Sequence, residues 1–284
     1  EWGLIEIPRV ESYHGLIFAS WNEEICPLQD YLGDFRSYLD LLITKPYLGG
    51  IEVIPGRGRY IQNLNWKVIA ENFMFDDYHV PMTHASIFKA LAETSFNWWS
   101  GLAKWEETTY QILSISPIGA PHCIGAVALW GDPRPFSAFH LQLQWDRAFA
   151  RELGREAEEW VEERYRRIEE YIKQGNPKVL GVANGTIFPN LSVLVGLSAF
   201  RGTSLIQWHP KGPTAHEAWQ WCAVEREAPE SVKRMAAILQ ASDQAPAGMI
   251  TIDDQANFDR MQDNLKAARY QKKPRPFSYH MSGK

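Results

Sequence analysis

Short segments in which apolar and polar residues alternate cluster along this chain instead of taking turns with helical segments. Alternation with a period of two puts successive side chains on opposite faces of a strand, so that one face can be buried. Clustered strands of this kind predict an α+β fold with an antiparallel sheet, not a doubly wound parallel sheet. The predicted strands are residues 15–20, 51–54, 60–65, 105–116, 124–130, 186–196, 204–209 and 218–225.

Helices are predicted at residues 28–42, 66–78, 147–173, 229–240 and 253–268. The third of these is the most charged segment of the chain, and two interpretations of it are open: an interaction helix, or a solvated helix with an apolar stripe. Opposite charges at i,i+4 spacing favour the solvated helix. The stripe would consist of Leu153, Trp160, Tyr165, Ile168 and Ile172.

The last predicted helix has a carboxylate at its N-terminus and an apolar pattern of its own. We expect this helix to pack against the sheet through the side chains of Ile252, Phe258, Met261 and Leu265. Spacings of three and four residues place side chains on the same side of a helix.

The composition is that of an ordinary globular protein, with 45% hydrophobic and 22% charged residues in 284. A single domain, residues 1–284, is the simplest organisation. The net charge of −5 gives no indication of a nucleic-acid partner, and no apolar run approaches the roughly 20 residues of a membrane span. Cys26, Cys123 and Cys222 are far apart and in no C-x-x-C pairing, so we expect a reduced cytoplasmic protein without disulfides or a cysteine-ligated cluster.

Two histidines in the segment ENFMFDDYHVPMTH, residues 71–84, have the spacing of a bent metal site. His79 and His84 are five positions apart, which on an unbroken helix leaves their side chains roughly 140° apart around the axis. Pro81 disfavours helical geometry at Val80, and we expect it to end or kink the helix there. A chain bent between the two histidines can direct both imidazoles at one point.

A mononuclear iron site for oxygen chemistry uses two imidazoles and one carboxylate. The best distant carboxylates are in GMITIDDQANFDRMQ, residues 248–262, where Asp253 and Asp254 are predicted at the start of a helix. A zinc hydrolase would need H-E-x-x-H or H-x-x-E-H, and neither motif occurs.

These motifs resemble one known family. The pattern E-N-F-x-x-D-x-Y-H-x-x-x-x-H looks like the iron-binding signature of Rieske non-haem iron oxygenases, and more narrowly of the large (alpha) subunit of aromatic-ring-hydroxylating dioxygenases. The segments RVESYHGLIFASW, GTIFPNLSVL, WHPKGP and AGMITIDDQANF resemble further landmarks of that catalytic domain, in the right order. The resemblance implies a helix-grip fold, an antiparallel sheet covered by helices that include a long C-terminal helix.

The resemblance also implies roles for single residues. His79, His84 and Asp254 match the iron ligands of the family, and Asn72 matches a weak or absent ligand close to the iron. Asp76 matches a carboxylate that couples this iron to a Rieske cluster on a neighbouring subunit.

Four further residues would lie around this set. Tyr78 and Asp253 would support the ligands from behind, and Phe73 and Val80 would line the substrate pocket.

The cofactors implied are a mononuclear Fe(II) and a Rieske [2Fe-2S] cluster. The cluster motif, C-x-H followed by C-x-x-H, is absent from this chain, so we expect an N-terminal Rieske domain upstream. The activity implied is O2-dependent cis-dihydroxylation of an aromatic ring, with NADH electrons delivered through a reductase and often a ferredoxin. The partners implied include a small beta subunit in an α3β3 assembly. Two alternatives are a Rieske-type monooxygenase or demethylase, and a helix-grip binding module without a functional metal site.

Overall fold

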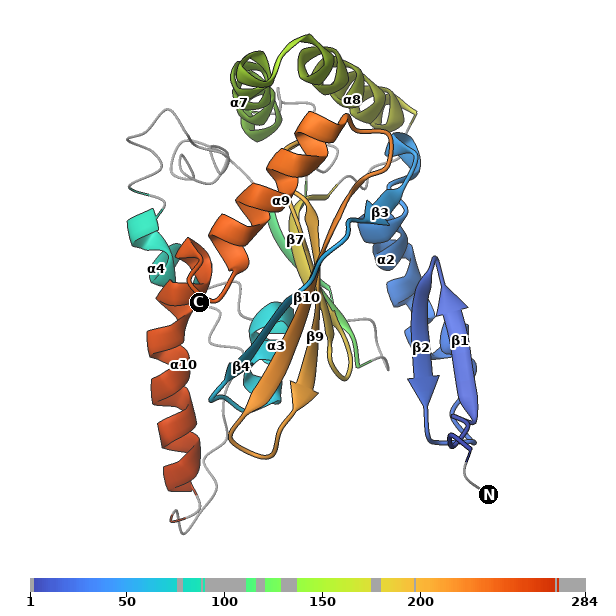
Figure 1. Ribbon diagram of the computed structural model, residues 1–284, viewed down its shortest axis with the longest axis vertical. Helices are drawn as coiled ribbons and strands as arrows, with labels where there is room; N and C mark the ends of the chain where they lie inside the picture. Colours follow the sequence, from blue (N-terminus) through green and yellow to red (C-terminus); the bar gives the residue numbers. More distant parts are fainter. Residues whose placement is uncertain are drawn as a thin grey trace.

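A central antiparallel sheet with helices on both faces organises the molecule, and a two-stranded hairpin lies near the N-terminus (Figure 1). The computed structural model of the chain describes residues 3–75, 79–87, 89, 111–115, 121–128, 137–174, 180–196, 198–268 and 270. The predicted α+β fold with an antiparallel sheet and a long C-terminal helix is confirmed.

The 8-stranded sheet has the order β3-β10-β9-β8-β7-β6-β5, and β4 also pairs with β10. All of these pairings are antiparallel. The strands are β3 Ile51–Val53, β4 Gly58–Gln62, β5 Gln111–Ile115, β6 Cys123–Ala128, β7 Leu180–Ile187, β8 Leu191–Val195, β9 Thr203–Pro210 and β10 His216–Glu225.

Helix α3, Trp66–Phe75, packs across one face of the sheet over β6, β7, β8 and β9. Two side chains of the sheet bond to carbonyl oxygens of α3. The Thr186 hydroxyl donates to the Ala70 carbonyl at 3.1 Å, and the Cys123 thiol donates to the Met74 carbonyl at 2.9 Å. The apolar core beneath the helix contains Leu64, Val68, Ile69, Ala70, Ile206, Trp208, Ala218 and Phe258.

The opposite face of the sheet is covered by α1, Leu28–Leu32, a 3-10 turn at Gly33–Phe35, and α2, Arg36–Ile43. This is the predicted helix at residues 28–42, interrupted where Gly33 takes a φ of 51°. Buried Leu32, Phe35, Leu39 and Leu42 pack there on Ile124, Val193 and Leu205 of the sheet.

The hairpin consists of β1, Arg9–Tyr13, and β2, Leu16–Ser20, of which only β2 was predicted. Four of the five β1 side chains are exposed, so β1 lacks the apolar alternation of a half-buried strand. Tyr13 ties the hairpin to α2, because its hydroxyl donates to Asp40 Oδ1 at 2.6 Å.

The predicted helix at residues 147–173 is two helices, α7, Ser137–Leu153, and α8, Arg155–Lys173. Gly154 separates them with a φ of 100°, a conformation that other residues rarely adopt. The apolar stripe of α8 is buried at Trp160, Tyr165 and Ile168, against a core that includes α9, Glu230–Gln244.

The predicted strand at residues 186–196 is also two elements, because β7 and β8 form a hairpin around the turn Phe188–Asn190. Pro189 has no N–H to donate to a ladder, which is why the chain turns within an otherwise apolar run. The fourth predicted strand falls largely on residues 105–110 and 116, which lie outside the described residues, as do 129 and 130 of the fifth.

The C-terminal helix, α10, runs from Met249 to Ala268 and therefore begins one turn earlier than predicted. Its predicted contact face is wrong in part. Phe258 is buried in the core under α3, but Ile252, Met261 and Leu265 are 57%, 47% and 39% exposed. The side of α10 that faces the sheet is mostly polar, as shown below.

None of the described helices combines the length and the apolar character needed to cross a membrane. All three cysteines are free thiols, as expected, and Cys123 and Cys222 are shielded whereas Cys26 is exposed.

A buried ion cluster joins α8 to the end of β10. Arg164 Nε lies 2.9 Å from one oxygen of Glu225, and Lys45 Nζ lies 3.3 Å from the other. All three side chains are at least nine-tenths buried. Glu225 is the carboxylate that both cations share, and although burial opposes them they hold its pKa below the usual value.

We predict that Glu225→Gln lowers the free energy of unfolding by about 3–5 kcal/mol, because it leaves two buried cations without their counter-charge. Denaturant unfolding at pH 7 measures the change. The control is Glu159→Gln, which breaks an exposed i,i+4 pair with Arg155 and should leave the free energy of unfolding nearly unchanged. Equal effects of the two substitutions would contradict the role given to Glu225.

His122 is fully buried and links three segments. The Phe188 N–H donates to His122 Nδ1 at 3.1 Å, so the ring proton is on Nε2, which lies 2.9 Å from the Tyr31 carbonyl. Burial lowers the pKa of His122, because a charged ring would lose its hydration and could no longer accept the Phe188 N–H.

The lowered pKa of His122 makes the folded protein less stable as the pH falls. Below pH 6.5, the ordinary pKa, the unfolded chain takes up a proton that folded His122 excludes, so stability falls on acidification until the lowered pKa is reached. We predict that His122→Gln, which keeps a donor and an acceptor but does not titrate, reduces the slope of unfolding free energy against pH by up to about 1.4 kcal/mol per unit in this window. An unchanged slope between the two proteins in denaturant titrations at several pH values would refute this.

Candidate metal centre

The two histidines flank a single short helix, α4, which spans His79–Thr83. His79 is its first residue, and His84 lies in the turn that follows. Their ring centroids are 5.2 Å apart, with the rings at 72° to one another. The two imidazoles therefore come together, as their spacing predicts.

Pro81 does not end a helix at Val80, which was one of the two effects predicted for it. Val80 and Pro81 are both helical, and the proline lies in the first turn of α4 instead of ending a helix. The first N–H groups of a helix have no partner within it, so a proline is tolerated there.

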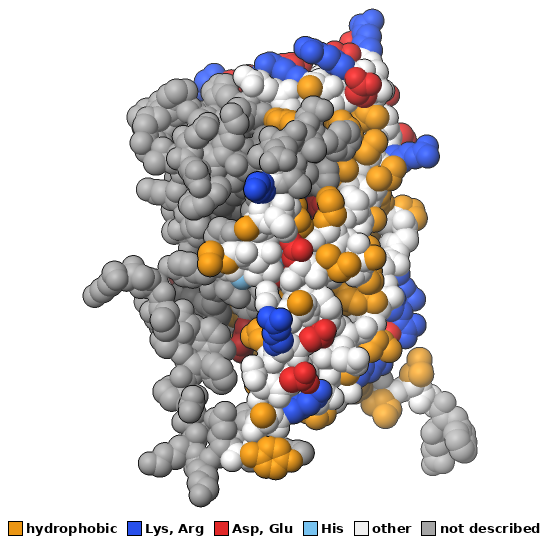
Figure 2. Space-filling view, turned by 90° about the vertical axis from the view of Figure 1, so that its left-hand side faces the viewer, with side chains coloured by type: hydrophobic (Ala, Val, Ile, Leu, Met, Phe, Trp, Pro, Cys, Tyr) orange, Lys and Arg blue, Asp and Glu red, His pale blue; other side chains and the backbone are white. Residues whose placement is uncertain are grey.

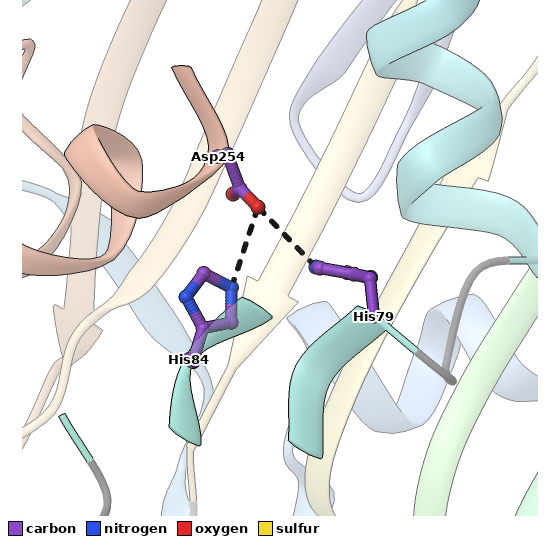
Figure 3. Close-up of side chains that lie close together, drawn as sticks. All are labelled: His79, His84 and Asp254. Atoms are coloured by element: carbon purple, nitrogen blue, oxygen red, sulfur yellow. Dashed lines mark ion pairs between the residues drawn. The ribbon is translucent and has the colours of Figure 1, made fainter. Parts of the chain in front are cut away.

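Asp254, on α10, completes the group. His84 Nε2 lies 3.5 Å from Asp254 Oδ1, and His79 Nε2 lies 3.8 Å from the same oxygen. Figure 3 shows the three side chains pointing at one another from α4, the turn after it and α10. One ligand atom of each lies within 4.8 Å of the other two, and this is the single such group found among the described residues.

The site is shielded from water. The side chains of His79, His84 and Asp254 are 14%, 4% and 13% exposed. On this side of the molecule Figure 2 shows only a small patch of histidine surface. Burial, and then the neighbouring His79, lower the pKa of His84 to about 4, so its ring is neutral at pH 7. Neutral imidazole is the form that binds metal ions.

Polar side chains fix the position of α10 against the rest of the chain. The buried Gln262 accepts the Asn65 N–H at 2.7 Å, just before α3 begins. The amide of Gln62 on β4 donates to Gln255 at 2.7 Å, and that of Asn257 donates to Thr83 of α4 at 3.2 Å. The last bond joins the helix that carries Asp254 directly to the helix that carries His79.

Each histidine has a polar side chain beside its outer ring nitrogen. Asn72 Nδ2 lies 3.4 Å from His79 Nδ1, and Asn72 is 9% exposed. Asp253 Oδ2 lies 3.5 Å from His84 Nδ1. Burial raises the pKa of Asp253, and a hydrogen bond from Ser86 opposes that rise. Asp253 and Asp254 lie in the second turn of α10, not at its start as expected.

Of the remaining predicted site residues, only Phe73 has a described side chain. Asp76 and Tyr78 lie outside the described residues, and so does the side chain of Val80. Phe73 is partly buried, with its ring centroid 5.7 Å from that of Trp208, so at least part of it packs on the sheet. Its role as a pocket residue stays a prediction.

Sequence reasoning missed the residues that hold α10. Gln255, Asn257 and Gln262 were passed over because isolated amides are usually exposed. Their positions close to Asp254 in DDQANFDRMQ were the available signal, since a carboxylate held for function needs a fixed helix beneath it.

The family model for the catalytic domain of the ring hydroxylating alpha subunit matches residues 52–281. The chain belongs to this family. The chain is 31% identical to the large oxygenase component of the naphthalene 1,2-dioxygenase system of Pseudomonas putida, over 93% of this chain and 54% of that protein. It is 30% identical to the large oxygenase component of the 2,4-dinitrotoluene dioxygenase system of Burkholderia sp. (strain RASC), over 90% of this chain and 52% of that protein.

Solved structures of ring-hydroxylating oxygenases are also similar to this chain. A naphthalene 1,2-dioxygenase from Rhodococcus sp. bound to indole is similar, with a TM-score of 0.65 and 27% identity over 95% of this chain and 56% of that chain. A quaternary ammonium Rieske monooxygenase, at 13% identity and a TM-score of 0.53 over 92% of this chain and 53% of that one, shows the shared fold alone. The chain thus spans about half the length of the relatives it matches.

The donor set fits a transition-metal ion. Two atoms each about 2.1 Å from one ion stand about 3–4 Å apart. The two separations between Asp254 and the imidazoles, 3.5 and 3.8 Å, fall in that range, and all three donor atoms lie within 4.8 Å of one another. Those separations are too long for hydrogen bonds, so the three groups do not hold one another together directly. Two imidazoles and one carboxylate are the ligands of non-haem Fe(II) sites that leave positions open.

We predict that His79→Ala, His84→Ala and Asp254→Ala each weaken Fe(II) binding by more than about 100-fold, beyond the range found for supporting residues. Iron content after anaerobic reconstitution, with competition against a chelator, measures the loss. The control is His14→Ala, on the exposed hairpin turn, which should bind iron normally. Full iron occupancy in Asp254→Ala would remove Asp254 from the ligand set.

Proposed function

We propose that this chain is the iron-binding catalytic part of a terminal oxygenase that adds both atoms of O2 to an aromatic ring, giving a cis-dihydrodiol. The observation that carries the proposal is the convergence of His79, His84 and Asp254 in a buried site of a ring-hydroxylating family member. These three residues would be the ligands.

Bound Fe(II) would supply the activation of O2, which no protein side chain can supply. The part played by the chain is to hold the donors and exclude water. Burial keeps His84 neutral and available, and Asn72 beside His79 restricts the rotation of that ring. With iron on His79 Nε2, the proton of that ring would be on Nδ1, and the Asn72 amide, whose Nδ2 faces that nitrogen at 3.4 Å, would turn over to accept it through its oxygen.

Electrons would reach this site from outside the chain. We propose a Rieske [2Fe-2S] cluster in an upstream domain, supplied from NADH by a reductase and a ferredoxin. Asp76 would carry the coupling between the iron site and the cluster of a neighbouring subunit in an α3 or α3β3 assembly. The support is the family membership and the length of the relatives, about twice that of this chain.

The proposed substrates are uncharged aromatic rings. Relatives are named for naphthalene, 2,4-dinitrotoluene and benzene, none of which is charged. An aromatic carboxylate would call for a cation in the pocket. Buried Arg201 does not suit that part, because its guanidinium lies 3.1 Å from Asp243 of α9.

Isotope incorporation tests the activity. The full-length protein, supplied with ferredoxin, reductase and NADH, is expected to convert naphthalene or benzene under 18O2 into a cis-dihydrodiol with both labelled atoms from one O2 molecule. A product with a single labelled atom would instead establish the monooxygenase alternative. Absence of turnover in an iron-loaded, reduced protein across a panel of neutral aromatics would overturn the proposal.

Asp76→Asn gives that experiment a matched variant. The substitution keeps the size of the side chain and is expected to leave iron content unchanged while abolishing nearly all turnover, because electrons no longer cross between subunits. If the variant loses iron as fully as His79→Ala, Asp76 belongs to the metal site instead.

A further inference from the structure

The imidazole of His84 lies between two consecutive carboxylates of α10. Its Nε2 is 3.5 Å from Asp254 Oδ1, and its Nδ1 is 3.5 Å from Asp253 Oδ2. Neighbouring residues on a helix project about 100° apart around its axis, which lets one pair of aspartates face both nitrogens of one ring.

His84 Nδ1 and Asp253 Oδ2 are each buried, and neither has a hydrogen-bond partner among the described residues. Buried polar atoms without hydrogen-bond partners destabilise the folded protein unless they hydrogen bond to each other. They already face each other, at a separation slightly beyond hydrogen-bond length. Ser86, two residues after His84, hydrogen bonds to the same carboxyl and restrains it.

Asp253 is placed wrongly for a ligand. It is not part of the group whose donor atoms converge, and its near oxygen faces the ring nitrogen that points away from Asp254. A neutral imidazole that binds a metal through Nε2 carries its proton on Nδ1 and needs an acceptor there. Asp253 Oδ2 is the oxygen in position to be that acceptor.

We propose that Asp253 is a positioning residue: its carboxylate accepts the Nδ1 proton of His84, fixes the ring with Nε2 towards Asp254, and thereby strengthens metal binding. The proposal rests on the proposed function in that His84 is taken as a ligand. The two histidines then differ, because Asn72 gives His79 a neutral neighbour whereas Asp253 gives His84 a charged one. A charged acceptor makes the stronger hydrogen bond.

The test uses metal affinity and the ring proton in the chain loaded with Fe(II) or with diamagnetic Zn(II). Asp253→Ala is expected to weaken binding of either ion by about 10- to 100-fold. Asp253→Asn should lose less, since an amide oxygen can still accept. Asp263→Asn, on the exposed side of the same helix, is the control and should match the wild type.

The ring proton separates positioning from general support. In the Zn(II)-loaded wild type, the His84 Nδ1 proton is expected as a slowly exchanging low-field resonance. This resonance should move upfield in Asp253→Asn and be lost to exchange in Asp253→Ala. If Asp253→Ala fails to fold, Asp253→Asn decides alone.

The outcomes are distinct. Wild-type affinity and an unchanged resonance in Asp253→Asn and in any folded Asp253→Ala would overturn the positioning role and leave the proposed function standing. Weakened binding with an unchanged resonance would also overturn it, because Asp253 would then act elsewhere. Failure of the wild type itself to bind either ion would instead overturn the proposed metal site.

Discussion

The candidate metal centre depends on one apolar core, formed where α3 packs against the sheet. Val68 and Ile69 of α3 meet Trp208 of β9 in that core. Phe258, one turn beyond Asp254 on α10, is buried in the same cluster. Helix α10, which carries Asp254, and α3, which precedes α4 in the chain, therefore pack in the same core. Packed interiors are close to crystal density, so a shift of either element disturbs contacts made by the other.

Apolar packing alone would not set the rotation of α10 about its axis, because apolar contacts have little directionality. Hydrogen bonds, in contrast, are directional. The bonds of Gln255, Asn257 and Gln262 to three separate segments restrain the helix at points along its length. That explains why the inward side of α10 is largely polar while Met261 and Leu265 face outward. The rotation fixed in this way is what directs Asp254 at the two histidines.

The sequence allowed the central architecture to be predicted, and the errors have local physical causes. The long strands β9 and β10 alternate clearly enough to be found, and the motif of residues 71–84 contains both histidines of the site. Gly154 and Pro189 break a helix and a strand at positions where the surrounding pattern continues, so the two breaks were read as parts of longer elements. The convergence of Asp254 with His79 came from family resemblance, since no local pattern specifies which of many distant carboxylates will meet a histidine in space.

The partners of the buried charges were harder still to predict. Arg164 looks like one more member of a solvated, charged helix, yet it is buried on Glu225. The resemblance implied a supporting place for Asp253, but its contact with His84 in particular depends on the rotation of α10 and not on sequence spacing. Polar contacts between distant segments are settled by tertiary packing, which periodicity does not encode.

Gathering His79, His84 and Asp254 in a shielded site also links metal binding to folding. Asp254 is far from the two histidines in the chain and meets them only in the folded state, so an ion that binds all three adds its binding free energy to the stability of the fold. At 100 times its dissociation constant, such a ligand stabilises the native state by about 2.7 kcal/mol. The folded chain already holds His84 neutral at pH 7, so no proton has to leave that ring before it binds. The cost of bringing a carboxylate and two imidazoles out of water is met by the core of α3 and the polar docking of α10. An ion bound by these residues would therefore join α4 to α10.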